Sequence, residues 1–131
     1  MAESIIASKS YSFALRMIKL YKHLQKEQRE FYVLTKQVLR SGTSIGANVE
    51  EALGSPSSAD FRNKLTIALK EARETSYWLR LLKDSEVITI SSFESVHQEC
   101  QELIKILKSI ILTSKKNEKK GPIPPTQDSQ L

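Results

Sequence analysis

The feature that most constrains this chain is an apolar spacing of three and four residues that runs, almost free of proline, to about residue 114. Of the four prolines in the 131 residues, only Pro56 precedes the last ten. Proline breaks a helix because it lacks the N–H and clashes with the preceding turn. Apolar side chains three and four residues apart lie on one helical face. The chain is therefore expected to fold almost entirely as long helices.

Turn signals divide this pattern into four segments. Gly54 suits the left-handed position that ends a helix. Ser57 with Asp60, and Ser91 with Glu94, have the spacing of N-terminal capping boxes. The predicted helices cover about residues 8–28, 30–53, 57–83 and 91–114.

The number and length of these helices predict the fold class. A chain of 131 residues buries one modest core. Four helices with short joins predict an all-α domain over residues 1–114, an antiparallel up-down four-helix bundle. Residues 115–131 are charged and then proline-rich, so we expect a disordered tail there.

Composition indicates a cytoplasmic protein. The N-terminus has no basic-then-apolar signal sequence. No apolar run approaches the roughly 20 residues that a membrane span needs. Cys100 is the only cysteine, so it has no internal disulfide partner and is expected as a small core residue.

The sequence Gly42-Thr-Ser-Ile-Gly46 has the G-x-S-x-G pattern of a hydrolase nucleophile elbow. Ser44, then Asp60 or Asp84, then His97 also follow the chain order of an α/β-hydrolase triad. That motif works only where a strand turns sharply into a helix. Here the apolar spacing passes through the motif without a change of phase. We therefore predict a protein that is not an enzyme and has no catalytic residue; loss of an esterase activity in Ser44→Ala would support the alternative.

Small side chains in this motif predict close packing of the second helix. Gly42, Ser44 and Gly46 leave room for another helix or for a large ring. Two glycines inside a helix cost about 1 kcal/mol each relative to alanine, which tight packing would offset. Trp78, the only tryptophan, and its neighbour Tyr77 are the candidates for the ring.

Two further polar patterns have structural interpretations. Asn48 falls on an apolar stripe, so we expect a buried amide that sets helix register. A di-iron bundle needs a Glu-x-x-His pair on each of two helices. Glu94-Ser-Val-His97 is a single copy, so no metal and no cofactor is predicted.

The net charge of +5 is unevenly distributed. Residues 9–40 carry eight Lys or Arg against two acids, whereas residues 84–102 carry five acids and no Lys or Arg. Clustered cations bind a phosphate backbone without reading sequence. The predicted phosphate contacts are Arg16, Lys19, Lys22, Lys26, Arg29, Lys36 and Arg40.

The first helix carries more apolar surface than one bundle needs. Ala14, Ile18 and Tyr21 form a second apolar stripe on this helix, and Tyr11 and Leu15 add a third edge. The whole apolar arc is about 220°, too broad for a helix with open solvent behind it.

Three sequence blocks together resemble a bacterial protein family. They read SFALRMIKLYKHL, LRSGTSIGANVEEALG and DFRNKLTIALKEARETSYWLRLL. They are similar, over about residues 8–112, to the four-helix-bundle proteins first noticed as reading frames in the intervening sequences of 23S ribosomal RNA genes. The resemblance implies a small cytoplasmic bundle that assembles as a barrel-shaped homopentamer. A related branch, the accessory variability proteins of diversity-generating retroelements, binds a reverse transcriptase and nucleic acid through a basic barrel surface.

These observations predict a non-enzymatic, homo-oligomeric helical scaffold that binds the backbone of RNA or DNA through a basic surface. The alternative is a purely protein–protein adaptor, such as an accessory subunit of a reverse transcriptase. No membrane partner is expected.

Overall fold

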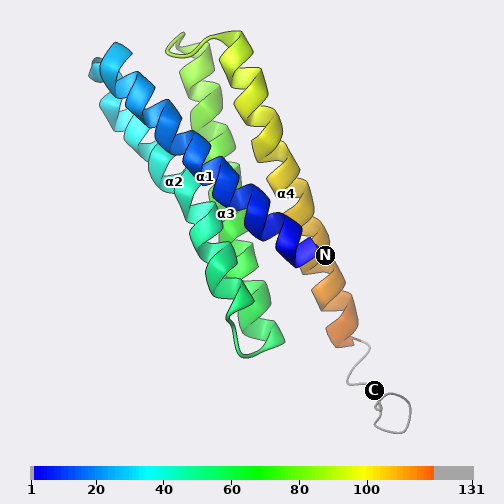
Figure 1. The fold of residues 1–131 in the computed structure, drawn as a ribbon. Helices are drawn as coiled ribbons and strands as arrows, with labels where there is room; N and C mark the ends of the chain where they lie inside the picture. Colours follow the sequence, from blue (N-terminus) through cyan, green and yellow to red (C-terminus); the bar gives the residue numbers. More distant parts are fainter. Residues whose placement is uncertain (1, 120–131) are drawn as a thin grey trace, which may run out of the picture.

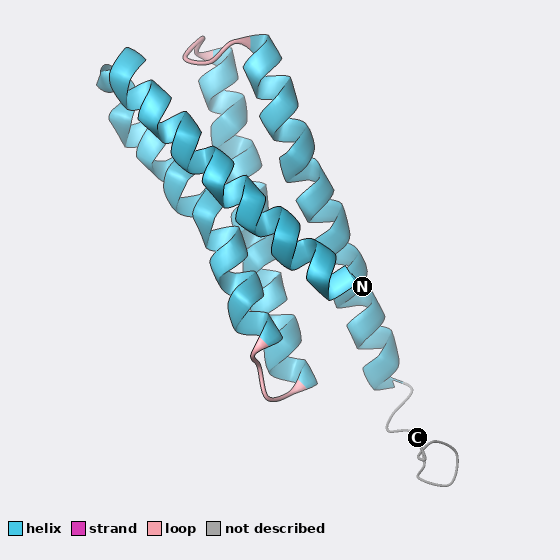
Figure 2. Cartoon of the chain, viewed as in Figure 1, coloured by secondary structure: helices cyan, strands magenta, loops and turns pink. Residues whose placement is uncertain are grey.

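The chain forms four long helices in an up-down-up-down order. A computed structural model describes residues 2–119, with side chains from residue 5 onward. The elements are α1 (Ala2–Glu27), the single 3-10 turn η1 (Arg29–Phe31), α2 (Tyr32–Leu53), α3 (Ser58–Asp84) and α4 (Ile90–Lys119). Figure 1 shows successive helices running in opposite directions, and Figure 2 shows no strand along the described part of the chain. The predicted all-α, four-helix fold is confirmed.

Two helices are longer than the periodicity predicted. α1 begins at Ala2 rather than near residue 8, and Ile6 in the added turn is buried in the core. α4 continues to Lys119 rather than ending at 114, so the prediction of a disordered tail is wrong for residues 115–119. An ion pair between Arg62 of α3 and Glu118 holds this last turn against the bundle. Residues 120–131 of the predicted tail lie outside the described residues.

In the turn between α2 and α3, the predicted cap at the start of α3 is observed, but the one predicted for the end of α2 is not. The Ser57 Oγ accepts a hydrogen bond from the Asp60 backbone N–H at 3.1 Å, which is the expected N-terminal cap. Gly54 has φ −96°, so the left-handed geometry predicted for it is wrong. Its N–H instead bonds to the Glu51 carbonyl oxygen at 3.2 Å.

The turn into α4 differs from the predicted capping box. The Thr89 Oγ1 accepts a hydrogen bond from the Ser92 N–H at 3.1 Å, so the helix begins before Ser91. The preceding Val87 is buried, and its N–H bonds to the Leu82 carbonyl oxygen at 2.8 Å. This buried contact holds the connection against the end of α3, and α4 begins at Ile90, one residue before the predicted start.

One hydrophobic core runs along the centre of the molecule, and all four helices contribute to it. α2 lies between α1 and α3, and α3 lies between α2 and α4, whereas α1 and α4 make the sparsest contact of neighbouring helices. In Figure 1, α1 crosses from beside α4 at its N-terminus towards α2 at its C-terminus. Fully buried members of the core include Phe13, Met17, Leu24, Ile45, Leu65, Leu79, Leu103 and Leu107.

Candidate nucleic-acid interface

The seven predicted cations lie on three consecutive elements. Arg16, Lys19, Lys22 and Lys26 are on α1, Arg29 is in η1, and Lys36 and Arg40 are on α2. The structure divides them into two arginines that are paired within the chain and five side chains that extend into solvent.

Arg16 joins α1 to α4. Its Nη1 donates to the Glu99 Oε2 at 2.7 Å, and its Nη2 donates to the Ser95 Oγ at 2.6 Å. Two turns nearer the N-terminus of α1, the Lys9 Nζ lies 3.5 Å from the Glu102 Oε1. Two of the five acids in residues 84–102 therefore face cations of the same chain.

Arg40 joins α2 to α3 in the same way. Its Nη1 donates to the Glu71 Oε1 at 3.3 Å, and its other terminal nitrogen pairs with Glu74. The Trp78 Nε1 also donates to the Glu74 Oε2, at 3.0 Å. Arg16 and Arg40 are therefore structural ties between helices, and their charge is matched by carboxylates of this chain.

The other five cations form a basic edge, which we define as Lys19, Lys22, Lys26, Arg29 and Lys36. All five are exposed, and none has an ion pair within residues 5–119. They lie in the C-terminal half of α1, in η1 and in the first turns of α2. The junction of α1 and α2 is at the upper left of Figure 1. Two exposed acids, Glu27 and Glu30, share this end of the molecule.

Ser44 is not part of a catalytic site in the described structure. It lies inside α2, and its Oγ donates to the Arg40 carbonyl oxygen at 2.6 Å. The triad that the chain order allowed is not assembled, because His97 contacts Ser76 of α3 instead. The apolar phase that continues through Gly42–Gly46 corresponds to uninterrupted helix.

The contact between Ser76 and His97 was not anticipated from the sequence. The Ser76 Oγ and the His97 Nε2 are 2.8 Å apart, and the Gln101 Nε2 lies 3.2 Å from the same nitrogen. The imidazole stacks on Phe93 with ring centroids 4.6 Å apart. Burial, and then the positive charges of Arg80 and Lys83, lower the pKa of His97.

This pair lacks the surroundings of a serine nucleophile. Ser76 lies in the middle of α3, where its backbone N–H is used in the helix and is not free to form an oxyanion hole. Within residues 5–119, no carboxylate hydrogen-bonds to His97. The arrangement is a polar contact that ties α3 to α4.

The two helix-interior glycines lie under α1. A methyl group at Gly42 would lie 2.9 Å from the Met17 Sδ, and one at Gly46 would lie 3.3 Å from the Ser10 carbonyl oxygen. α1 therefore approaches α2 closely at these positions, and neither glycine has a ring among its nearest atoms. Trp78 lies instead edge-on to Tyr77, with ring centroids 5.1 Å apart.

The register-setting role predicted for Asn48 is not observed. Asn48 is half-buried, and its Nδ2 donates to the Ser44 carbonyl oxygen of its own helix at 2.9 Å. A different polar pair joins α2 to α3: the Thr75 Oγ1 donates to the Ser41 Oγ at 2.9 Å, with both side chains buried.

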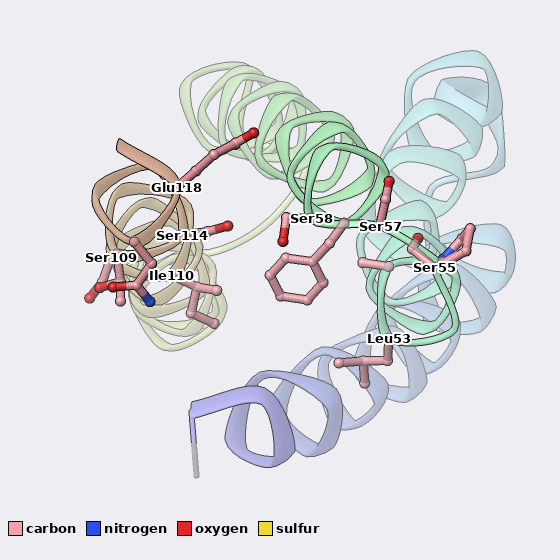
Figure 3. A pocket seen from close by; sticks show the side chains of 13 residues that line it. Leu53, Ser55, Ser57, Ser58, Ser109, Ile110, Ser114 and Glu118 are labelled. Atoms are coloured by element: carbon pink, nitrogen blue, oxygen red, sulfur yellow. The ribbon is translucent and has the colours of Figure 1, made fainter. Parts of the chain in front are cut away.

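A groove lies at the opposite end from the basic edge. Its volume is about 810 Å³. Figure 3 shows around it Leu53 from the end of α2, Ser55 and Ser57 from the connecting turn, Ser58 from the start of α3, and residues of α4. Hydroxyl and apolar groups line it, including Phe61 and Ile110.

Neither a metal-binding cluster nor a membrane-spanning helix is present among the described residues. These residues contain no group of three or more His, Cys, Asp or Glu that could hold a metal ion. Within residues 2–119, no helix is both long enough and apolar enough to cross a bilayer. Cys100 is buried, and burial raises the pKa of its thiol to about 12.

The fold and this surface define a class: a small all-helical protein of four long helices with cations gathered at one end. The chain belongs to the 23S rRNA-intervening sequence protein family, whose model matches residues 2–109. The predicted family resemblance is thereby confirmed.

A solved structure supports the same assignment. It is a protein with unknown function from the S23 ribosomal protein family of Bacteroides thetaiotaomicron, 54% identical to this chain. The match covers 85% of this chain and 98% of the other, with a TM-score of 0.82. Among curated proteins, no significant relative was found.

Proposed function

We propose that the protein is a non-enzymatic helical scaffold that binds the phosphate backbone of RNA or DNA through the basic edge. The observation that carries this proposal is that the predicted cations fall, within the described residues, into an ion-paired group and an unpaired group. Arg16 and Arg40 are paired within the chain, whereas the five members of the basic edge are exposed and have no ion pair within residues 5–119. Free clustered cations release counterions from a phosphate backbone, which makes binding favourable and dependent on salt.

We also propose that the scaffold is a homo-oligomer, a homopentamer by resemblance to the family. Tyr11, Leu15 and Ile18 share one face of α1 and are 63%, 49% and 38% exposed. An apolar face of this kind marks an interaction surface. The same face supports the second candidate function, an adaptor that binds a protein partner such as a reverse transcriptase.

A salt titration tests the nucleic-acid proposal. Fluorescence anisotropy would follow a labelled single-stranded RNA between 50 and 200 mM salt. Five phosphate contacts predict a loss of roughly 100-fold in affinity across this range, since each contributes about 0.7 to the slope of log K against log salt. A flat response would overturn the proposal.

A matched pair of variants localises the binding. Lys22→Gln with Lys26→Gln removes two charges from the basic edge, and the salt slope is expected to fall by about 1.4. Lys64→Gln with Lys115→Gln removes the same charge elsewhere and is expected to leave the slope near that of the wild type. Equal effects of the two pairs would contradict a localised site and favour the adaptor.

Sedimentation velocity tests the assembly. Leu15→Glu with Ile18→Glu places two charges on the apolar face of α1 and is expected to convert the oligomer to monomers. A wild-type protein that sediments as a monomer at micromolar concentration would overturn the proposed oligomer.

A further inference from the structure

A second row of cations follows the outer face of α3. Lys70, Arg73 and Arg80 are exposed, and their helical spacing places them on one face with Tyr77. Between residues 5 and 119 none of the three has an ion pair. The spacing of the three cations around a tyrosine is visible in the sequence, but the row lies outside the long block of cations at residues 9–40.

Tyr77 stands in the middle of this row and is held in place from two sides. The Arg80 guanidinium carbon lies 5.8 Å from the centre of the Tyr77 ring. Trp78 contacts the ring edge-on, with an angle of 66° between the ring planes. The Tyr77 side chain nevertheless remains 47% exposed. An aromatic ring that is fixed on a cationic surface offers a platform on which an unpaired base can stack.

Among residues 5–119, no carboxylate forms an ion pair with a cation of this row. Glu71 and Glu74, the acids of the central part of α3, pair with Arg40 of α2. Asp84, at the end of the helix, lies 3.5 Å from the Lys83 Nζ. The three cations of the row therefore keep their charge available for a ligand.

We propose that the outer face of α3 is a second nucleic-acid surface, which binds single-stranded RNA or DNA through phosphate contacts to Lys70, Arg73 and Arg80 and base stacking on Tyr77. The row extends over ten residues, or about 15 Å at the rise of an α-helix. That length matches about four phosphates of one stacked strand. A duplex keeps its bases paired and stacked, so it can use the cations but not the ring.

This proposal extends the proposed function and uses none of the residues of the basic edge. The two surfaces can therefore be tested separately in the full-length protein. The probes are a labelled 12-nucleotide oligouridylate and an RNA duplex of the same length. Tyr77→Leu is expected to weaken oligouridylate binding about fivefold or more, and to leave duplex binding unchanged. Tyr77→Phe keeps the ring and is expected to bind as the wild type does.

Arg73→Gln with Arg80→Gln tests the phosphate contacts. This variant is expected to weaken binding of both probes and to lower the single-strand salt slope by about 1.4. Because both substituted side chains are exposed, thermal melting is expected to stay within a few degrees of the wild type, which separates lost binding from lost folding.

The possible outcomes distinguish the two surfaces. If Lys22→Gln with Lys26→Gln weakens binding while the α3 variants match the wild type, the basic edge stands and the α3 surface is wrong. If the arginine variant weakens binding but Tyr77→Leu does not, base stacking is wrong. If the wild-type protein binds neither probe, both proposed nucleic-acid surfaces are wrong.

Discussion

Met17 of α1 lies directly over Gly42 of α2, so close that a methyl group at position 42 would be 2.9 Å from the Met17 Sδ. Met17 is fully buried, so its side chain could shift only within the packed core. The glycine of the G-x-S-x-G motif therefore permits the approach of two helices. This close approach accounts for the motif as a packing feature of α2.

Gly42→Ala is expected to destabilise the protein even though alanine favours helix. Alanine gains about 1 kcal/mol in helix propensity, whereas overpacking against Met17 costs about 1–3 kcal/mol. Urea unfolding would measure the net loss. Gly54→Ala is the control, because a methyl group there has no neighbour nearer than 3.9 Å. Higher stability of Gly42→Ala would show that the close approach is not real.

The buried hydroxyl pair of Thr75 and Ser41 provides a second test. Thr75→Val keeps the shape but removes the donor to the Ser41 Oγ, with an expected loss of about 1 kcal/mol in the free energy of unfolding. Thr66→Val is the control. The hydroxyl of Thr66 is exposed and donates a hydrogen bond only within its own helix, to the Arg62 carbonyl oxygen at 2.8 Å. Equal losses in the two variants would contradict a specific role for the pair between α2 and α3.

Cys100 is expected to resist alkylation in the native state. Its Sγ lies 3.2 Å from the Ala72 carbonyl oxygen, and burial raises the thiol pKa from 9.0 to about 12. Only the thiolate reacts, so labelling by iodoacetamide at pH 8 should require unfolding. The labelling rate in buffer, compared with that in guanidinium chloride, measures this protection. Comparable rates would contradict the burial of Cys100.

The same shift predicts lower stability in alkaline solution. An unfolded thiol loses its proton near pH 9, whereas the folded thiol keeps it to about pH 12. The folded state therefore binds more protons across this range, and the contribution of Cys100 to stability falls as pH rises. Urea unfolding at pH 8 and pH 10 for wild type and Cys100→Ala would show a smaller pH dependence in the variant.

Features that depend on local pattern could be predicted from the sequence. The four helices follow from apolar spacing, and the cap at Ser57 follows from a serine placed three residues before an acid. Burial of Cys100 follows from its place on an apolar stripe. Each of these needs information from only a few turns of one helix.

Features that depend on distances between helices could not be predicted. Arg16 lies among basic residues in sequence, and only the approach of α4 brings Glu99 to it. Likewise, nothing near Asn48 in the sequence shows that the polar tie to α3 comes from Ser41 instead. The last turn of α4 also extends beyond the apolar pattern, and there Glu118 pairs with Arg62 of α3, which is distant in sequence.

His97 is expected to make stability fall in mildly acidic solution. Burial and the charges of Arg80 and Lys83 lower its pKa below the usual 6.5. Between the folded pKa and about pH 6.5, the unfolded state binds more protons than the folded state, so stability decreases as pH falls through this window. Below the folded pKa no further loss comes from this group. Urea unfolding from pH 8 to pH 5 should show the decrease in wild type and in His23→Gln, which replaces the other, exposed histidine, but not in His97→Gln. A slope that persists in His97→Gln would assign the effect to another residue.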